Sequence, residues 1–182
     1  MKVTSSHARA GASNLRESFA AIYDEYMPRV YRYVSYRVNS TACAEDLTSM
    51  IFEKALQKFN QYRPEKGAIS TWLFAIARNT VIDYYRIKHG SKTVPLQEWS
   101  DVSGNSSPVE EEFDRRAERI RLKECLSLLS PKEQEIVALK FGSEQKNRQI
   151  AASLNISESN VGTIVYRAIQ QLRKCFQEAH SG

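Results

Sequence analysis

The sequence predicts an all-α protein that consists of two small helical domains joined by a flexible acidic linker. Apolar residues recur every three or four positions along most of the 182 residues, which is the period of an amphipathic helix. No segment sustains the alternation of apolar and polar residues that marks a strand. A stretch from Lys92 to Glu111 replaces the helical pattern with proline, glycine, serine and acidic residues, which indicates a linker.

The first domain is expected to span residues 16–91, after a mobile amino-terminal tail (residues 1–15). Pro28 interrupts the apolar stripe of its first helix and either kinks one helix or separates two. The stripe consists of Phe19, Ile22, Tyr23, Tyr26, Val30, Tyr31, Val34 and Val38.

Two more helices are expected in this domain, separated by a polar loop with aromatic residues (60–69). The earlier one has possible caps in Asn39, Ser40 and Thr41, and its acidic residues Glu45 and Asp46 suit the positive end of the helix dipole. Its predicted buried face is Leu47, Met50, Ile51, Ala55 and Phe59. The later helix runs from about Ser70 to Lys88, and its predicted inward face is Trp72, Leu73, Ile76, Ala77 and Thr80.

The acidic linker is assigned to residues 92–112 and the second domain to residues 113–182. A helix is expected to resume near Phe113. Another is expected to begin at Ser130, because Ser130, Pro131 and Glu133 suit the N-cap, N1 and N3 positions of a capping box. It is predicted to end at Gly142 and to bury Ile136, Val137, Leu139 and Phe141.

Residues 147–173 have the pattern of two helices joined by a tight turn. Ile150, Ala151 and Leu154 give the first helix an apolar face, and Ser157 is placed to cap the second. The second helix repeats apolar residues at Val161, Ile164, Val165, Ala168 and Leu172. Its first turn presents short polar side chains of a size that reaches base edges in a major groove. The pattern indicates a DNA-binding helix-turn-helix, and the alternative is an ordinary helical hairpin.

Charge is distributed unevenly around a net value of +5. Residues 1–95 hold 14 basic and 8 acidic side chains, residues 96–118 hold 2 and 7, and residues 119–182 hold 10 and 6. Two basic blocks on either side of an acidic connector suggest two surfaces for a polyanion. A pair of helical domains with ordinary surface charge explains the numbers about as well.

The three cysteines (Cys43, Cys125 and Cys175) are scattered and never form a C-x-x-C pair. This spacing argues against a disulfide framework and against a structural zinc site, and it suits a reducing cytoplasm. The amino terminus has no apolar signal region, and no run of residues approaches the length of a membrane span. We therefore expect a soluble cytoplasmic protein without metal or other cofactor.

Four segments together resemble bacterial RNA polymerase sigma factors of the extracytoplasmic-function (ECF) type, which contain only regions 2 and 4. Residues 44–56 (AEDLTSMIFEKAL) resemble region 2.2, and residues 70–86 (STWLFAIARNTVIDYYR) resemble regions 2.3 and 2.4. Residues 129–141 (LSPKEQEIVALKF) and the helix-turn-helix resemble region 4. The resemblance covers about residues 16–175 in the family order, and it implies that the two helical domains are sigma regions 2 and 4.

The resemblance implies contacts with core RNA polymerase and with the −10 promoter element. Polymerase contacts, to a coiled coil of the largest subunit, would involve Asp46, Leu47 and Met50. Ser49 and Met50 depart from the Gln-Glu that is usual in the family. The −10 residues would be Tyr62, Arg63, Lys66, Arg78, Asn79 and Arg86, because aromatic rings replace lost base stacking and cations hold phosphates. For Trp72 we favour a place in the core, and for Asp83 an ion pair with Arg86.

The resemblance places the −35 element on the helix-turn-helix, with region 4 also contacting the polymerase flap. Base-facing positions would be Ser159, Asn160, Gly162 and Thr163. Ser157 is the cap, and Arg148, Tyr166 and Arg167 would contact phosphates. Many relatives carry basic residues where this chain has Gly162 and Ile164, so a different −35 preference is expected, with Lys146 and Arg148 compensating in part.

Two other classes of protein compete with a sigma factor. A stand-alone helix-turn-helix regulator would explain residues 143–175, but it leaves residues 44–86 unexplained. A DNA-modifying enzyme would need clustered acids for a metal ion, or a nucleophile with its base; the sequence has no such constellation, so no catalytic residue is assigned. The resemblance also implies regulation by an anti-sigma factor and a path for the acidic linker toward the RNA exit channel, although the linker serves equally well as a spacer.

Overall fold

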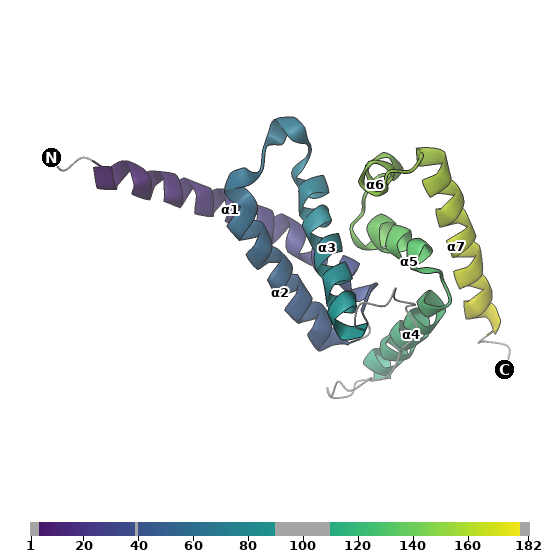
Figure 1. Cartoon of the computed structure of the whole chain (residues 1–182). Helices are drawn as coiled ribbons and strands as arrows, with labels where there is room; N and C mark the ends of the chain where they lie inside the picture. The colour runs from purple at the N-terminus through teal and green to yellow at the C-terminus, as the bar shows by residue number, and fades with distance from the viewer. Residues whose placement is uncertain (1–3, 39, 90–109, 179–182) are drawn as a thin grey trace.

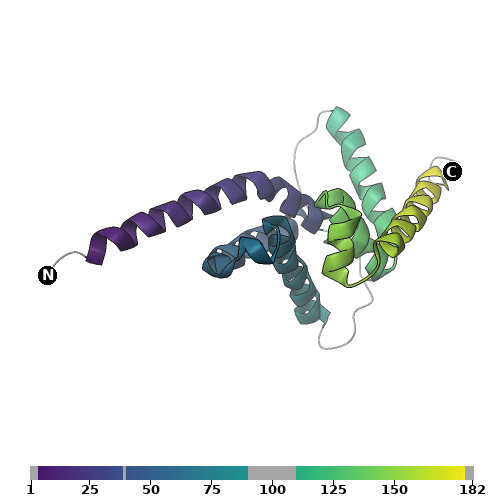
Figure 2. The same cartoon turned by 90° about the horizontal axis from the view of Figure 1, so that it is seen from above.

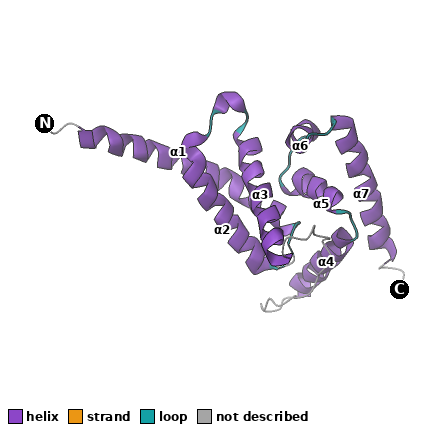
Figure 3. Ribbon diagram, viewed as in Figure 1, coloured by secondary structure: helices purple, strands orange, loops and turns teal. Residues whose placement is uncertain are grey.

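The computed structural model describes the backbone of residues 4–38, 40–89 and 110–178, and the described backbone contains helices and turns but no strand (Figures 1 and 3). Helices α1 to α3 form the amino-terminal domain, and α4 to α7 form the carboxyl-terminal domain. The all-α prediction with two helical domains is therefore confirmed. Most of the acidic linker, residues 92–109, lies outside the described residues. None of the helices within the described ranges is long and apolar enough to cross a membrane.

Helix α1 (Thr4–Ser35) is one continuous helix that includes Pro28. It begins within the segment expected to be a tail, and it curves along its length in the view from above (Figure 2). Of the two alternatives for Pro28, the structure shows one helix rather than two. The carboxyl-terminal half of α1 supplies the buried residues of the predicted stripe: Phe19, Tyr26, Val30 and Val34.

Helix α2 (Thr41–Lys58) begins as predicted, because the Ser40 side chain accepts a hydrogen bond from the Cys43 backbone nitrogen at 3.4 Å. Its buried face includes Leu47, Ile51 and Ala55, but Met50 is 43% exposed and was wrongly assigned to this face. Ala44, Thr48 and Phe52 are also buried on this helix, which packs against α1 and α3.

Two short 3₁₀ turns, η1 (Phe59–Gln61) and η2 (Pro64–Lys66), connect α2 to α3 (Ile69–His89). Gly67 ends the second turn with φ 157°, a value that a residue with a side chain rarely adopts. The predicted inward face of α3 is confirmed for Leu73, Ile76, Ala77 and Thr80, which are all buried.

The carboxyl-terminal domain begins with α4 (Glu110–Ser127) and α5 (Pro131–Val137), which continues as a π-helical segment, η3 (Ala138–Gly142). Ser130 and Glu133 form the predicted capping box at the start of α5. Phe141 is 42% exposed rather than buried. A π-helical turn contains more residues than an α-helical turn, so it rotates the residues that follow it away from the positions that a regular α-helix would give them.

The helix-turn-helix consists of α6 (Asn147–Leu154) and α7 (Glu158–Glu178). Asn155 ends α6 in the left-handed conformation (φ 52°, ψ 49°), which asparagine tolerates better than most residues. The Ser157 hydroxyl accepts a hydrogen bond from the Asn160 backbone nitrogen at 3.1 Å and so caps α7, as the sequence predicts.

The two domains share one hydrophobic core and are packed directly against each other. Buried residues of α1, α2 and α3 belong to the same cluster as Ile136, Leu139, Ile150 and Val161 of the carboxyl-terminal domain. The backbones of the two domains approach closely at Gly142, since a Cβ atom there would lie 2.8 Å from the Tyr33 Cα and 2.9 Å from its backbone nitrogen. Figure 2 shows the end of α1 meeting this domain.

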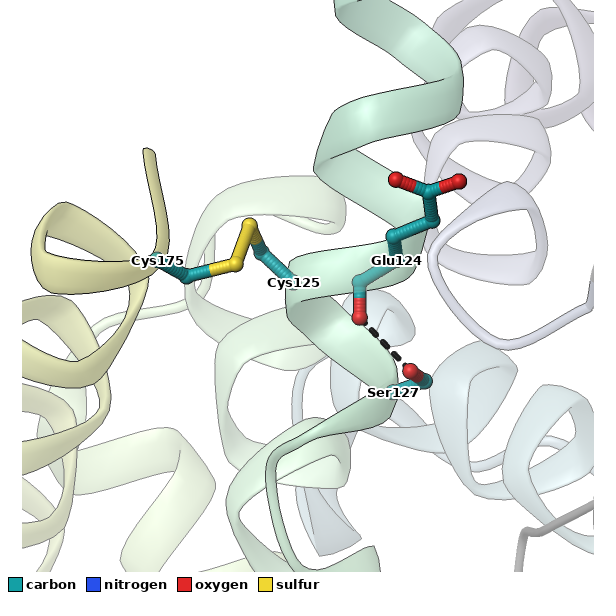
Figure 4. The surroundings of a disulfide bond; sticks show 4 residues. All are labelled: Glu124, Cys125, Ser127 and Cys175. Carbon is teal, nitrogen blue, oxygen red and sulfur yellow. Dashed lines mark hydrogen bonds between the residues drawn. A yellow bond between two sulfur atoms is a disulfide. The ribbon is translucent and has the colours of Figure 1, made fainter. Parts of the chain in front are cut away.

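A disulfide bond joins Cys125 of α4 to Cys175 of α7, with 5.8 Å between their Cα atoms (Figure 4). The sequence-based expectation of free cysteines is therefore wrong for this pair, and only Cys43, among the described residues, remains a thiol. The pairing escaped prediction because the two residues are 50 positions apart and meet only when α4 packs on α7.

The Tyr85 hydroxyl donates a hydrogen bond to the Arg37 carbonyl and so ties α3 to the end of α1. Burial raises the pKa of Tyr85 to about 12; Arg37 lowers it in part, and Cys43 raises it further. The unfolded chain ionises at the usual value near 10, so this stabilisation is complete below pH ~10 and is lost as the pH rises toward 12.

We therefore expect the free energy of unfolding of the natural protein to fall between pH 10 and 12 by roughly 2 kcal/mol more than that of a Tyr85→Phe variant. Urea titrations monitored by circular dichroism across this range would measure the difference. Tyr166→Phe, at an exposed position, is the matched control and should decline as the natural protein does. Parallel curves for the natural protein and Tyr85→Phe would contradict the assignment.

Candidate nucleic-acid interface

The proposed −35 surface lies on the first three turns of α7 and on the start of α6. Ser159, Asn160 and Thr163 are exposed on α7, and Gly162 is half-buried between them. The three positions assigned to phosphates are exposed as well: Arg148, Tyr166 and Arg167. Tyr166 is 65% exposed. The structure therefore leaves these side chains accessible to a DNA partner.

Two hydroxyls on this surface are engaged with the backbone of their own helix. Ser157 is occupied as the cap of α7, and Thr163 donates to the Ser159 carbonyl at 3.1 Å. Thr163 can still accept a hydrogen bond, whereas Asn160 has both donor and acceptor groups available for a base edge. Asn160 is therefore the side chain on α7 best suited to direct reading of a base.

Gly162 is not required by packing, because a Cβ atom there would meet only the Asn147 Nδ2 atom at 3.8 Å, an ordinary van der Waals distance. The missing side chain at this position therefore leaves open space at the proposed DNA surface. The expected difference in −35 preference stays a prediction.

The loop before α3 contains a cluster of aromatic side chains. Tyr62 lies 5.4 Å from Trp72 and 6.4 Å from Phe59, measured between ring centroids, and its hydroxyl donates to the Gly67 carbonyl at 3.0 Å. Trp72 packs against the core, as expected. Contacts among these rings shape the loop. An unpaired base of the −10 element would therefore have to stack on the outer edge of the aromatic cluster.

Two of the predicted −10 cations, Arg63 and Lys66, lie exposed on this loop. The Arg63 guanidinium donates to the Asn60 carbonyl at 2.9 Å and to the Tyr62 carbonyl at 3.1 Å. Its remaining N–H groups are free to reach a phosphate, since a guanidinium carries five.

Helix α3 carries the other three predicted −10 residues in different surroundings. Asn79 is exposed, and Arg86 is exposed and paired with Asp83 at 2.8 Å, as the sequence predicts. Arg78 instead points toward the carboxyl-terminal domain, where its Nε atom lies 3.9 Å from a carboxylate oxygen of Glu135. Arg78 therefore does not share an exposed surface with Asn79 and Arg86 in this structure.

The proposed polymerase surface on α2 is reduced to two of its three predicted residues. Leu47 is only 3% exposed and packs in the core, because it lies one turn from Ile51 on the buried face. Asp46 and Met50 are exposed on the outer face and lie one helical turn apart. An acid beside an exposed apolar side chain suits a contact in which apolar packing anchors and charge sets orientation.

Sequence reasoning missed a polar cluster between the domains. Glu135 of α5 is 6% exposed, and its carboxylate accepts hydrogen bonds from the Tyr33 hydroxyl at 2.8 Å and from Arg37. Burial raises the pKa of Tyr33, and Arg37 and Arg78 lower it in part. Glu135 directly precedes a run of apolar residues that begins with Ile136 and Val137. This position was the one indication in the sequence that the acid is buried.

The helix-turn-helix and the basic helical domain packed against it define the class of helical DNA-binding proteins. Residues 22–89 match sigma-70 region 2, and residues 119–172 match sigma-70 region 4. The chain is 31% identical to the ECF RNA polymerase sigma factor SigM of Bacillus subtilis over 159 residues, covering 85% of this chain and 93% of SigM. It belongs to the ECF sigma factors of the sigma-70 family.

Another relative supports this assignment, and solved structures share the fold. The chain is 30% identical to the ECF sigma factor BldN of Streptomyces coelicolor over 167 residues, which are 92% of this chain and 62% of BldN. Its fold is similar to that of CnrH in complex with the cytosolic domain of CnrY (TM-score 0.69, 18% identity, 94% and 95% of the two chains). It is also similar to the sigma factor RpoE of Bartonella quintana in complex with the anti-sigma factor NepR (TM-score 0.66, 17% identity, 88% and 98%).

Proposed function

We propose that this ECF sigma factor binds core RNA polymerase through Asp46 and Met50 of α2, recognises a −10 element through α3 and its preceding loop, and recognises a −35 element through α7. The observation that carries the proposal is the exposed polar end of the helix-turn-helix in a chain that also has region 2. A stand-alone regulator would need only the first of these two features.

Strand opening is the part of the function assigned to the amino-terminal domain. Arg63 and Lys66 would hold phosphates beside the aromatic cluster, and Asn79 would contact a base edge. Stacking of an unpaired base on an aromatic side chain contributes about 1–3 kcal/mol. The Tyr62 ring is the first candidate for such stacking.

The remaining proposals concern where and with what the chain works. We place its activity in the cytoplasm, where the polymerase meets chromosomal DNA. An anti-sigma factor is a proposed partner, because CnrH and RpoE were solved in complex with CnrY and the anti-sigma factor NepR. The acidic linker is proposed either to enter the RNA exit path or to act as a spacer.

Two substitutions on α7 should separate base reading from phosphate contact. Asn160→Ala is expected to weaken promoter binding by about 1–3 kcal/mol and to relax the preference at one base pair of the −35 element. Arg167→Ala is expected to weaken binding to all sequences alike and to reduce the salt dependence of log K by about one unit. Fluorescence anisotropy of the holoenzyme on promoter libraries at several salt concentrations measures both, and equal changes in sequence preference would contradict the division of roles.

The function is tested by transcription in vitro with sigma-free core polymerase on fragmented genomic DNA, with and without the chain, followed by mapping of RNA 5′ ends. New start sites that share two upstream motifs are the expected result. A folded chain that produces no new start sites would instead support the stand-alone regulator.

A further inference from the structure

Two features of the helix-turn-helix that cost stability occur together at its proposed DNA surface. Gly162 stands inside α7, where glycine is less favourable than alanine, although neither packing nor a positive φ requires it. Asn147 begins α6, and its Oδ1 atom is buried with no hydrogen-bond partner within the described part of the chain. A buried acceptor without a partner is also unfavourable. Departures of this kind from the best local choice are expected where a function requires them.

Asn147 and Gly162 face each other where α6 packs against α7 (Figure 1). A Cβ atom built at Gly162 would lie 3.8 Å from the Asn147 Nδ2 atom. The carboxamide of Asn147 therefore lies beside the space that a side chain at position 162 would occupy. Asn147 is half-buried, whereas Lys146 and Arg148 on either side of it are exposed. The start of α6 thus combines two exposed cations with one amide that faces the gap at Gly162.

We propose that Asn147 is a further promoter-binding residue: through the gap left by Gly162, its Nδ2 atom donates a hydrogen bond to a phosphate of the −35 element. The inference rests on the proposed function and extends it to a residue that the sequence did not single out. The donor Nδ2 lies at the gap, while the acceptor Oδ1 is buried. The side chain can therefore donate one hydrogen bond, but it cannot bind a base edge with both polar atoms. A phosphate oxygen, which only accepts, matches this single donor.

The position of Asn147 in the motif also favours a phosphate over a base. The first helix of a helix-turn-helix crosses the DNA backbone, and the second lies in the major groove. Asn147 belongs to the first helix and Asn160 to the second. Because an amide is neutral, its contact with a phosphate releases no counterion and adds nothing to the salt dependence of binding. Asn147 would thus fix the position of α7 on DNA without the positive charge that position 162 lacks.

The same unpaired chemistry at Gln145 does not indicate a DNA contact. Both polar atoms of the Gln145 carboxamide are buried with no hydrogen-bond partner in the described chain. The residue is only 2% exposed, however, which is too deep for a phosphate to reach. Asn147 differs because it is half-buried and because its amide faces the gap at Gly162.

The test measures holoenzyme binding to a promoter duplex obtained by start-site mapping, in which single phosphates of the −35 element are replaced by uncharged methylphosphonates. Asn147→Ala is expected to weaken binding about tenfold, the lower end for a hydrogen bond to a charged group. One methylphosphonate that weakens binding of the natural protein should have no further effect on Asn147→Ala. Arg167→Ala should lose its sensitivity at a different phosphate. The salt dependence of log K should stay unchanged for Asn147→Ala, because no charge is removed.

Two substitutions at position 162 test the role of the gap. Gly162→Ala places a methyl group at an ordinary contact distance from the amide, so Asn147→Ala should still cost about tenfold in that background. Gly162→Lys extends a charged side chain over Asn147 and should increase the salt dependence of log K by about one unit. Asn147→Ala should then cost less than about twofold, because the lysine takes over the phosphate and the two changes are no longer additive.

Thermal unfolding distinguishes a DNA contact from a structural role. Asn147→Ala removes a buried acceptor that has no partner, so the melting temperature should not fall. If Asn147→Ala does not fold, Asn147→Asp decides. It keeps the shape of the side chain, suits the first turn of a helix and places a negative charge beside the proposed phosphate, so it should weaken binding by more than tenfold.

Unchanged affinity of these variants would overturn the proposal. So would a loss of affinity that leaves the sensitivity to every methylphosphonate as it was, or a loss that is as large in the Gly162→Lys background. These outcomes leave the natural holoenzyme able to start transcription, so they overturn this inference alone. A natural holoenzyme that starts no transcription is a failure of the proposed function, and the inference fails with it.

Discussion

Replacing Cys175 with serine is expected to lower the free energy of unfolding of the oxidised carboxyl-terminal domain by about 4 kcal/mol, because the disulfide closes a long loop and restricts the unfolded chain. The bond joins α4 to α7 across a sequence separation of 50. The half-buried position of Cys175 leaves room for a serine hydroxyl to reach solvent. Denaturant titration of the natural protein and the variant under oxidising conditions measures the difference.

The same comparison under a reducing agent provides the control. With both thiols reduced, the natural protein and Cys175→Ser should differ by less than about 1 kcal/mol, because the loop is no longer closed. Cys43→Ser is the matched cysteine substitution in the other domain, and it should show no dependence on oxidation. A stability difference that persists after reduction would show that packing, and not the cross-link, accounts for the effect. Cytosolic disulfides are rare, so the redox state of this pair in the cell sets how much of this stabilisation the protein has.

Met50→Lys is expected to weaken binding to core RNA polymerase by about 30-fold, which corresponds to ~2 kcal/mol, the size expected for the centre of an interface. Met50 is the exposed apolar side chain of α2 that lies one turn from Asp46. A lysine at position 50 would remove the apolar contact and place a positive charge beside Asp46. Titration of labelled core polymerase with the purified chain measures the affinity.

Leu56→Lys is the matched control, since Leu56 is also an exposed apolar residue of α2. It lies on a different face of the helix, beside an apolar groove of about 370 Å³ that Phe19, Ala20, Tyr23 and Asp24 also line. Leu56→Lys should retain most of the affinity for polymerase. If it loses as much affinity as Met50→Lys, the polymerase contact includes this groove; if only Leu56→Lys loses affinity, the assignment of Met50 is wrong.

Features that depend on a few neighbouring residues were predictable from the sequence. The capping box at Ser130, the cap at Ser157 and the tight turn between α6 and α7 all form as expected. Each depends on side chains that bond the backbone within three or four positions, so the local sequence contains all the partners. The ion pair between Asp83 and Arg86 belongs to the same category.

Predictions of which side chains are buried were wrong where the chain departs from regular α-helical geometry. They were also wrong where the buried face of a helix had to be chosen from the sequence. Phe141 was assigned to the core by a 3.6-residue period that the π-helical segment η3 does not follow. Met50 was assigned to the buried face of α2 because it is apolar, although its side chain is exposed. Burial depends on which neighbour covers a face, and an apolar side chain alone does not tell which face is covered.

The sequence by itself determined the helices, their caps, the helix-turn-helix and the membership of the ECF sigma factors. The tertiary structure decided which distant side chains meet. Glu135 reaches Arg37 across 98 positions and Tyr33 across 102, and Cys125 reaches Cys175 across 50. At Gly142 the backbone of η3 lies close to that of α1. Such pairs form only after whole helices have packed, because long-range contacts depend on the arrangement of many residues at once, whereas helix caps depend on a few adjacent ones.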